Sequence, residues 1–303
     1  MNILIIGSDG FIGKNLVEFY NNKYGYNVTE LDHKSVLTES NYDKYFNDKV
    51  DIIINCAGII KYTKESFGYY LLRENTDAVL TFLQSAKMFC TNLKAFIHLG
   101  SSSEYGFKMN LMREDMDLQP RTMYEATKAA GTMLCQGFAR EYDLPIVIVR
   151  PFTVYGKYMQ EDRFIPTLYN SIKKTEKIKI YNPKAVHDYI YIDDFIKGID
   201  ILIPQAKDIK GEVVNLGTGI QTTNFDVYIE IARLLPKFNI PTAVYAPLEN
   251  SSAVQFVEEN LHSYDSAFWG ACTIKARSLG FKAEISFEEG IKKYCEWRQK
   301  ERK

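Results

Sequence analysis

Three glycines near the start of the chain directly follow a short apolar strand and open a helix. Asn2–Ile6 is predicted to be a buried strand, Gly7, Gly10 and Gly13 follow it, and Ile12–Tyr24 is predicted to be a helix. Glycines at such a turn let the backbone bend tightly and bring the N-terminus of the helix against a pyrophosphate. The spacing therefore predicts a parallel α/β fold whose first strand-turn-helix unit binds a dinucleotide.

The same alternation of apolar strands and longer helices continues through the first half of the chain. Further strands are predicted at Asn27–Leu31, Asp51–Asn55, Ala95–Leu99 and Ile146–Arg150, with helices near Leu71–Phe89 and Met123–Tyr142. Nearly continuous apolar strands that alternate with helices are typical of a parallel sheet covered on both faces. With right-handed crossovers this is a doubly wound Rossmann sheet.

Beyond about Pro151 the strands become shorter and the loops richer in Tyr, Pro and Asn. We predict short strands at Ile178–Tyr181, Tyr189–Ile192 and Val213–Leu216, with helices near Arg163–Lys173, Phe225–Leu235 and Phe287–Arg298. This pattern indicates a smaller mixed α/β domain at the carboxyl edge of the sheet. The expected division is 1–156 for the dinucleotide-binding domain, with 187–203 returning to it, and 157–303 mainly for a substrate-binding domain.

Composition excludes several other classes of protein. The 303 residues are 46% hydrophobic with a net charge of −1, so we expect no nucleic-acid partner. No apolar run approaches the roughly 18 residues of a membrane span, and no secretory signal is evident. The five cysteines lack CxxC spacing and the four histidines are scattered, so we expect reduced thiols, no metal site and a cytoplasmic location.

Asp32 ends the second predicted strand and follows Gly13 by 19 residues. An acidic residue about 20 positions after the glycines can accept hydrogen bonds from ribose hydroxyls. A carboxylate there repels a 2′-phosphate and favours NAD, whereas His33 and Lys34 could receive that phosphate. The cofactor is therefore expected to be NAD or NADP, with NAD slightly favoured.

A tyrosine and a lysine four residues apart share one face of a predicted helix at Tyr124 and Lys128. A nearby ammonium lowers the pKa of a phenol, which can then act as a general acid or base. The chain repeats this spacing at Tyr45/Lys49 and Tyr169/Lys173, which we interpret as solvated pairs. Tyr124 differs because its helix is rich in small residues and follows a strand that ends in serines.

Those serines, Ser101, Ser102 and Ser103, begin the segment Gly100-Ser-Ser-Ser-Glu-Tyr-Gly106 at the carboxyl end of the Ala95–Leu99 strand. Ligands of open α/β sheets bind at this edge. A hydroxyl there can hydrogen-bond a substrate oxygen and stabilise developing charge, or it can simply cap the end of the strand.

Taken in order, the motifs resemble those of the extended short-chain dehydrogenase/reductases, in particular the NAD-dependent epimerase/dehydratase family that acts on nucleotide sugars. The motifs are the three glycines, Asn55-Cys-Ala-Gly58, Ser101, Tyr124/Lys128, Arg150-Pro-Phe-Thr-Val-Tyr-Gly156, Asp188-Tyr-Ile-Tyr-Ile-Asp-Asp194 and Asn215-Leu-Gly-Thr-Gly219. The resemblance extends from Met1 to about Trp297.

The resemblance assigns roles to individual residues. It implies that Ser101, Tyr124 and Lys128 are catalytic, with Tyr124 exchanging a proton with the sugar. It implies that the nicotinamide dinucleotide contacts Gly7, Gly10, Phe11, Ile12, Gly13, Asp32, Cys56, Ala57, Gly58, Asn75, Lys128 and Pro151. The nucleotide sugar would contact Ser101, Ser102, Thr153, Arg163 and His187. For Asn75 and Arg163, helix capping or surface pairing is an equally good interpretation.

Departures from the family pattern bear on the reaction. Family 4,6-dehydratases carry two acids directly after the catalytic hydroxyl, but Ser102 and Ser103 stand there, and Glu104 comes one place later. His187 replaces the usual phosphate-binding Arg, and Thr153 replaces a common Asn. The chain is most similar to reductases of the C4 ketone of NDP-4-keto-6-deoxyhexoses. The alternatives are a 4-epimerase with tightly bound NAD, a 4,6-dehydratase, and an NAD(P)-binding protein without turnover.

Family members usually pair two helices in a homodimer, and we expect the same here. The helices would be Leu71–Phe89 and Met123–Tyr142, whose apolar candidates are Leu80, Phe82, Leu83, Met133, Leu134 and Phe138. The nucleotide, the sugar and the stereochemistry of the product are not encoded in any motif.

Overall fold

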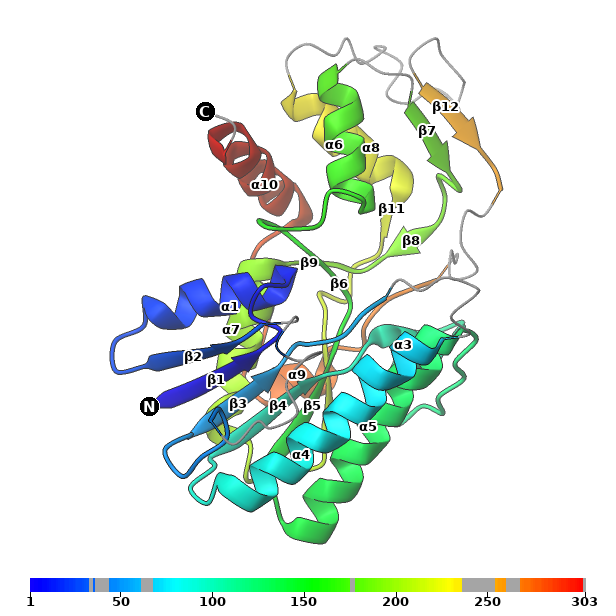
Figure 1. Ribbon diagram of the computed structural model, residues 1–303. Helices are drawn as coiled ribbons and strands as arrows, with labels where there is room; N and C mark the ends of the chain where they lie inside the picture. Colours follow the sequence, from blue (N-terminus) through cyan, green and yellow to red (C-terminus); the bar gives the residue numbers. More distant parts are fainter. Residues whose placement is uncertain are drawn as a thin grey trace.

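The computed structural model describes residues 1–32, 35, 44–60, 68–174, 178–235, 254–259 and 268–301. Its centre is a sheet of six parallel strands in the order β10-β5-β4-β3-β1-β2 (Figure 1). The strands are β1 (Asn2–Ile6), β2 (Asn27–Leu31), β3 (Ile52–Asn55), β4 (Ala95–Leu99), β5 (Ile146–Pro151) and β10 (Val213–Leu216). The chain runs outward from β1 in both directions, so the strand order reverses between β1 and β3, as in a doubly wound sheet.

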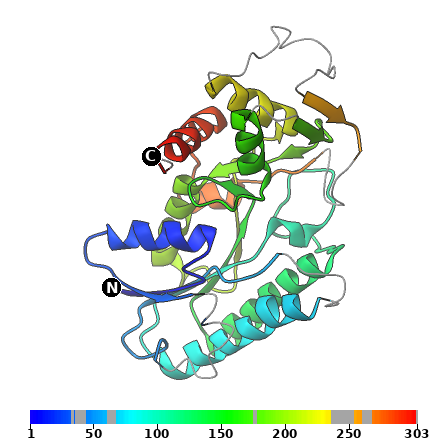
Figure 2. The same cartoon turned by 45° about the horizontal axis from the view of Figure 1, so that its top comes forward.

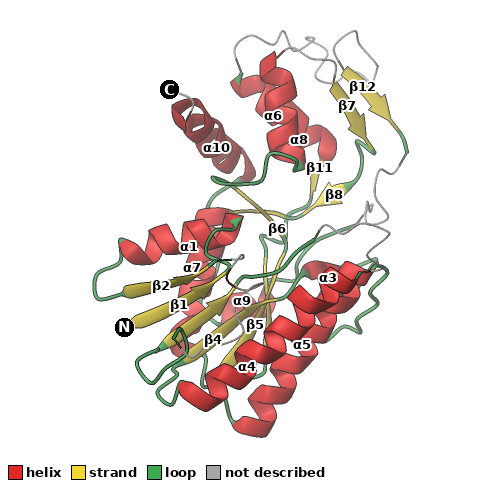
Figure 3. Cartoon of the chain, in the orientation of Figure 1, coloured by secondary structure: helices red, strands yellow, loops and turns green. Residues whose placement is uncertain are grey.

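Alternate residues of the strands enter two different cores. Ile3 and Ile5 pack toward α1 (Phe11–Asn21) and α7 (Ile192–Leu202). Leu4 and Ile6 pack toward α4 (Ala78–Phe89) and α5 (Met123–Tyr142) on the other face. Figure 3 shows the strands enclosed between these two pairs of helices. Because both faces of the sheet are buried, the sequences of its strands are continuous apolar runs.

The second half of the chain forms a smaller layer of helices and short strands above the carboxyl edge of the sheet (Figure 1). Its helices are α6 (Phe164–Lys174), α8 (Asn224–Leu234) and α10 (Phe287–Glu301), with the short α9 (Ile274–Ser278) nearer the sheet. Its two-stranded sheets pair β6 (Thr153–Tyr155) with β9 (Tyr189–Tyr191), β7 (Ile178–Tyr181) with β12 (Val254–Val257), and β8 (Val186–His187) with β11 (Thr222–Thr223). A short 3₁₀ turn, Ile203–Gln205, follows α7.

The chain crosses between the two layers more than once. The segment containing β9 returns to the sheet as α7, which contacts α1. β10 also returns, and it pairs with β5 at the edge of the sheet through Val213↔Ile148. The sequence-based division placed that strand in the smaller domain, because a single short apolar run does not reveal which sheet it joins. Figure 2 shows the smaller layer from another side, with α4 and α5 on the opposite side of the sheet from α1.

The predicted helix at Leu71–Phe89 is divided into three pieces. A short α3 (Tyr69–Leu72) runs into a π-helical turn (Arg73–Asp77), and α4 follows. π-turns of this kind often occur at functional sites. The turn contains Asn75, one of the predicted site residues.

Two predicted dimer-contact residues lie elsewhere than expected. Phe82 and Leu83 are fully buried between α4 and the sheet, so they belong to the core of one chain. Met133 of α5 is 59% exposed and remains available to a partner. None of the helices in the described part of the chain is long and apolar enough to cross a membrane.

Candidate functional site

The turn between β1 and α1 has the backbone geometry of a phosphate cradle. Gly7 has a φ of +80°, and a Cβ on it would lie 2.8 Å from the backbone of Ala57. A Cβ on Gly13 would lie 2.0 Å from the carbonyl oxygen of Gly7. Both positions therefore require glycine. Gly10 is the N-cap of α1, which has no side-chain cap and no acidic residue in its first turn. The positive end of this helix thus faces an open turn, as an anion requires.

Asp32 lies where the sequence predicted it, directly after β2 and beside β1, and it is exposed. The backbone N–H of Ser35 donates to its Oδ1 at 2.7 Å. His33 and Lys34, the predicted acceptors of a 2′-phosphate, lie outside the described residues. The glycine turn, the uncapped helix and this carboxylate fit an adenosine ribose and a pyrophosphate.

The next strand end supplies the segment Cys56-Ala57-Gly58. The Cys56 thiol donates to the carbonyl oxygen of Ile6 at 2.9 Å, and burial raises its pKa to about 12. Asn75 fixes the end of the segment, because its amide accepts from the N–H of Ile59 and donates to the carbonyl of Ile59, both at 3.0 Å. The same amide also donates to Thr127 at 3.2 Å. Asn75 therefore ties the loop after β3 to helix α5 through hydrogen bonds to Ile59 and Thr127.

Lys128 lies beside this loop, inside the protein. Its Nζ donates to the carbonyl oxygen of Leu99, the last residue of β4, at 2.6 Å. A Cβ on Gly58 would lie 3.6 Å from the same Nζ and 2.9 Å from Oδ1 of Asn75, so a glycine lets the loop pack closely against both side chains. Burial lowers the pKa of Lys128, and the negative charge of Glu104 opposes this shift.

Tyr124 and Ser101 face each other across the carboxyl end of β4. Helix α5 begins at a capping box in which Thr122 and Glu125 accept from each other's backbone N–H, which places Tyr124 in the first turn. Burial raises the pKa of Tyr124, whereas a hydrogen bond with Ser101 and the positive charge of Arg163 lower it. The sequence predicted that Lys128 would be the main influence on this phenol. This prediction was wrong: burial is the main influence and raises the pKa, and the opposing contributions come from Ser101 and Arg163. The ammonium of Lys128 is directed to the carbonyl oxygen of Leu99 instead.

Glu104 has its side chain in the interior of the protein. It lies in a 3₁₀ turn, Ser102–Tyr105, and its side chain is fully buried. Its carboxylate accepts from the N–H of Ser101 at 2.7 Å and forms an ion pair with Arg150 at 2.9 Å. The hydroxyls of Ser101 and Ser103 lie 2.7 Å apart. Serines therefore occupy the two positions directly after Ser101, and the one carboxylate of the segment is buried and paired with Arg150.

The predicted substrate residues come from separate elements. Thr153 lies in β6, and its N–H donates to the carbonyl of Asp188 at 2.9 Å, beside Pro151. His187 lies in β8 with its ring 5.9 Å from that of Tyr189. Arg163 directly precedes α6 and is close enough for its charge to act on Tyr124. Ser102 is buried at 6% exposure. The charge of Arg163 thus links this residue to the catalytic candidate Tyr124.

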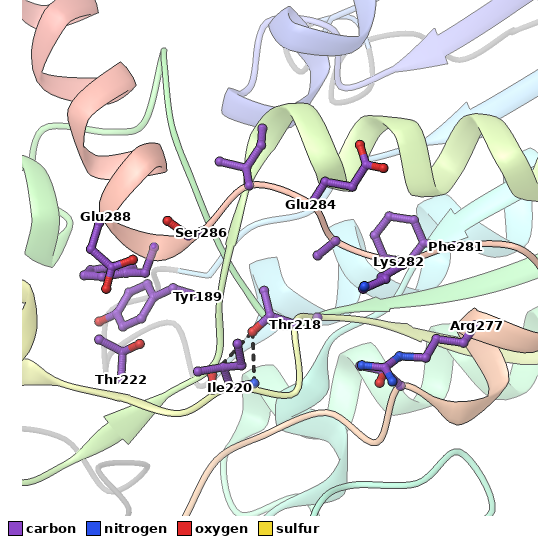
Figure 4. A pocket seen from close by; sticks show the side chains of 15 residues that line it. Tyr189, Thr218, Ile220, Thr222, Arg277, Phe281, Lys282, Glu284, Ser286 and Glu288 are labelled. Carbon is purple, nitrogen blue, oxygen red and sulfur yellow. Dashed lines mark hydrogen bonds between the residues drawn. The ribbon is translucent and has the colours of Figure 1, made fainter.

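A cavity of about 340 Å³ lies away from these residues. It is bounded by the loop after β10, by α9, and by the segment that leads into α10 (Figure 4). Its polar lining includes Thr218, Arg277, Lys282 and Glu284. None of the predicted catalytic, cofactor or substrate residues lines it. The predicted site lies at the carboxyl edge of the sheet, and this cavity is a separate feature.

Two features of the site escaped the sequence analysis, and one interpretation of residues outside the site was wrong. The first is the buried Glu104–Arg150 pair, which no local pattern reveals because the two residues are 46 positions apart. The second is the capping box at Thr122, whose Thr-x-x-Glu pattern is visible in the sequence. The wrong interpretation concerns the Tyr169/Lys173 spacing. Tyr169 is a core residue packed on Tyr294, so it is not part of a solvated pair.

A doubly wound sheet with a glycine cradle at its first turn, and a Ser, Tyr and Lys gathered at its carboxyl edge, defines a nicotinamide-dependent oxidoreductase of the short-chain type. The sequence profile of the NAD dependent epimerase/dehydratase family matches residues 3–217. The chain belongs to this family. Among the residues that the structure describes, no group of three or more His, Cys, Asp or Glu side chains is arranged to hold a metal ion.

Comparison with individual proteins gives the same family with low identity. A dTDP-glucose 4,6-dehydratase of Haemophilus influenzae is 24% identical, and the alignment covers 98% of this chain and 97% of the relative. The solved UDP-glucuronic acid 4-epimerase of Bacillus cereus, in complex with UDP-glucuronic acid and NAD, superposes with a TM-score of 0.84 at 23% identity over 99% of both chains. The dTDP-glucose 4,6-dehydratase of Bacillus anthracis, in complex with NAD, gives a TM-score of 0.78 at 22% identity, covering 99% of this chain and 97% of that one.

Proposed function

We propose that this protein is an NAD(P)-dependent reductase of the C4 ketone of an NDP-4-keto-6-deoxyhexose, with Tyr124 as the proton donor. One observation carries the proposal. The two positions directly after Ser101 hold serines, and the only carboxylate of the segment, Glu104, is buried and paired with Arg150. Elimination of water from a sugar needs a base next to the transient ketone, whereas reduction needs only hydride and one proton.

Each catalytic candidate would have a separate role in the reduction. Bound at the carboxyl edge of the sheet, the dinucleotide would supply the hydride. Ser101 would hydrogen-bond the C4 oxygen of the sugar, and Tyr124 would deliver its hydroxyl proton to that oxygen. Lys128 would hold the ribose of the cofactor. The raised pKa of Tyr124 keeps the phenol protonated, which is the form that a reductase needs.

The dinucleotide is proposed to lie over the glycine cradle. Gly7, Gly10, Phe11, Ile12 and Gly13 would surround the pyrophosphate, and Asp32 would bind the adenosine ribose. Cys56, Ala57, Gly58 and Pro151 would line the nicotinamide half, with Asn75 holding their loop. Because a carboxylate repels a 2′-phosphate, NAD is favoured over NADP. The solved epimerase and dehydratase relatives contain NAD, which agrees with this choice.

The nucleotide sugar is proposed to lie between the sheet edge and the smaller layer. Residues 1–156, together with 187–203, would bind the dinucleotide, and 157–303 would mainly bind the nucleotide. Arg163 supplies a permanent positive charge near the reacting carbon, and His187 supplies a pH-dependent one. We also propose a cytoplasmic location, since all five cysteines are free thiols.

A 4-epimerase is the second candidate. The UDP-glucuronic acid 4-epimerase of Bacillus cereus has the same fold along the whole chain, and its complex holds NAD. An epimerase uses its cofactor as oxidant and reductant in turn, so the cofactor need not leave. A reductase must exchange the oxidised cofactor for a reduced one after each turnover.

The test begins with the cofactor. The protein is purified without added nucleotide and denatured, and any released dinucleotide is identified by mass spectrometry. The reductase is supported if no dinucleotide is released and the protein then catalyses the oxidation of added NADH or NADPH by a 4-keto-6-deoxy nucleotide sugar. Stoichiometric NAD, together with interconversion of C4 epimers and no net oxidation of NADH, rejects the reductase in favour of the epimerase.

We further propose that the protein is a homodimer that pairs α4 and α5 of two chains. Met88 of α4 is 68% exposed, and Met133 of α5 is 59% exposed. Leu80, Leu134 and Phe138 are only partly buried and lie on the same two helices. Such residues on adjacent helices form an apolar surface that a second copy could cover.

A further inference from the structure

The carboxylate of Glu104 joins three structural elements inside the protein. Its Oε1 accepts from the backbone N–H of Ser101 at 2.7 Å and from the hydroxyl of Thr132 at 3.1 Å. Its Oε2 accepts from Nε of Arg150 at 2.9 Å. The side chains of Glu104 and Arg150 are 0% and 3% exposed, so solvent does not compete for these contacts.

Each partner belongs to an element that carries a predicted catalytic group or its neighbour. Ser101 is itself a member of the predicted triad. Thr132 follows Lys128 by one helical turn and Tyr124 by two, so the three side chains share one face of α5. Arg150 lies in β5, which pairs with β4 just below Ser101. One carboxylate therefore sets the distance between the serine and the helix of the tyrosine and lysine.

Neighbouring residues accommodate this carboxylate. A Cβ on Gly100 would lie 2.5 Å from Oε1 of Glu104 and 3.1 Å from the Thr132 hydroxyl, so only glycine leaves enough room. The guanidinium of Arg150 stacks on the ring of Tyr105 with its carbon 4.4 Å from the ring centroid. Tyr105 in turn donates to Asn215 of β10 at 2.8 Å. Contacts with β10, made through Tyr105 and Asn215, therefore also stabilise the Glu104–Arg150 pair.

We propose that Glu104, held by Arg150, is a positioning residue of the reaction centre that fixes Ser101 against Tyr124 and Lys128. It does not touch the substrate and donates no proton. The inference rests on the proposed function for its kinetic readouts. Its structural readout is independent of which substrate the enzyme uses.

The charge of Glu104 also acts on both groups that titrate in the site. Tyr124 is faced by Arg163 from the segment before α6, by Glu104 from the 3₁₀ turn and by Glu125 from its own helix. Lys128 is faced by Glu104 and by the neutral thiols of Cys56 and Cys135. Glu104 raises the pKa of Tyr124 and opposes the lowering of the pKa of Lys128. Without its charge, both groups lose their protons at lower pH.

An amide cannot replace this carboxylate. Ser101 and Thr132 donate to one oxygen and Arg150 donates to the other, whereas a glutamine side chain offers a single acceptor oxygen. Glu104→Gln must therefore release either the serine or the arginine. We expect kcat for the reduction to fall about 100-fold with KM for the nucleotide sugar unchanged. The alkaline limb of the kcat profile should move to lower pH.

Two further variants and a matched control accompany it. Thr132→Val removes one hydrogen bond with little change of volume and should lower kcat, whereas Thr132→Ser should restore it. The control is Asp194→Asn, another buried carboxylate, which accepts from the backbone N–H groups of Glu284 and Ile285 at 2.8 and 2.7 Å. This control should lower the Tm without moving kcat or the pH profile.

Hydrogen exchange gives a readout that needs no substrate. The amide of Ser101 should exchange faster in Glu104→Gln or Thr132→Val than in the wild type, but not in Asp194→Asn. Unchanged exchange, kcat and alkaline limb in the two variants would overturn the proposal. Faster exchange in a protein that reduces no keto sugar would reject the reductase while supporting the positioning role. If Glu104→Gln does not fold, Thr132→Val decides the question by the same criteria.

Discussion

The ammonium of Lys128 donates to the carbonyl oxygen of Leu99 at 2.6 Å, so helix α5 is tied to the last residue of the central strand β4. The serine segment begins two residues after Leu99, and Tyr124 lies one turn before Lys128. This bond therefore anchors the predicted lysine close to the predicted serine and tyrosine. It also directs the charge of the lysine to a backbone carbonyl. The pKa of Tyr124 is raised, chiefly because the phenol is buried.

Removal of the Tyr124 hydroxyl should abolish most of the activity. Tyr124→Phe is expected to lower kcat by about 10²–10⁴-fold, the usual effect of a positioned acid or base. Binding of the dinucleotide, measured by fluorescence titration, should be retained. Tyr45→Phe, a member of another Tyr/Lys spacing, serves as the control and should keep full activity. Turnover of Tyr124→Phe at the wild-type rate would exclude the assignment.

The dependence of kcat on pH should reflect the deprotonation of Lys128. Reduction needs the proton on Tyr124 and the charge on Lys128, so activity is present at low pH and is lost as either group deprotonates. The pKa of Tyr124 is raised from its ordinary value of about 10, whereas that of Lys128 is lowered from about 10.4. We expect the alkaline limb of kcat to follow Lys128 and to lie below the ordinary pKa of a lysine, because burial lowers the pKa of this ammonium. Lys128→Arg, which stays charged, should move this limb to higher pH, and an unmoved limb would assign it to another group.

Asp32 should decide between the two dinucleotides. Replacing the exposed carboxylate in Asp32→Asn removes the repulsion of a 2′-phosphate, so the ratio of kcat/KM for NADPH to that for NADH should rise about tenfold, equivalent to about 1.4 kcal/mol. Glu30→Gln removes a neighbouring exposed carboxylate of β2 as a control and should leave this ratio unchanged. An equal effect of both changes would indicate a general charge effect.

Two glycines should respond to alanine in opposite directions. In Gly13→Ala the new Cβ would lie 2.0 Å from the carbonyl oxygen of Gly7, so we expect a loss of about 3 kcal/mol in the free energy of unfolding and weak dinucleotide binding. Gly137 lies within α5, and a Cβ there would meet no neighbouring side chain or strand within 4 Å, so Gly137→Ala should stabilise by about 0.5–1 kcal/mol. Denaturant unfolding measures both changes. A Gly13→Ala protein as stable as the wild type would contradict the tight turn.

The proposed dimer makes a prediction about mass in solution. Met133→Asp places a charge in the proposed α5 surface and should convert a dimer into a monomer, as measured by light scattering. Ile274→Asp is the matched control, because Ile274 is a 75% exposed apolar residue on α9, away from α4 and α5. A monomeric wild-type protein would remove the dimer proposal.

Local patterns were sufficient for the framework of the fold. The bounds of β1, β2, β4, α5, β7 and β10 agree with those predicted, because their apolar runs or helical periods have clear ends. The parallel sheet and the family are confirmed. The interruption at Asn75 was not predicted, because a π-turn has no distinct local composition.

By itself, the sequence determined the order of strands and helices, the glycine turn and the candidate Ser101, Tyr124 and Lys128, because each depends on residues close together in the chain. Only the tertiary structure decided that β10 joins β5, that Phe82 and Leu83 lie in the core, and that Glu104 pairs with Arg150 below the site. These depend on contacts between distant segments. The sequence does not distinguish a buried glutamate from one that faces a substrate. Burial and the choice of an ion-pair partner are decided only when the chain has folded.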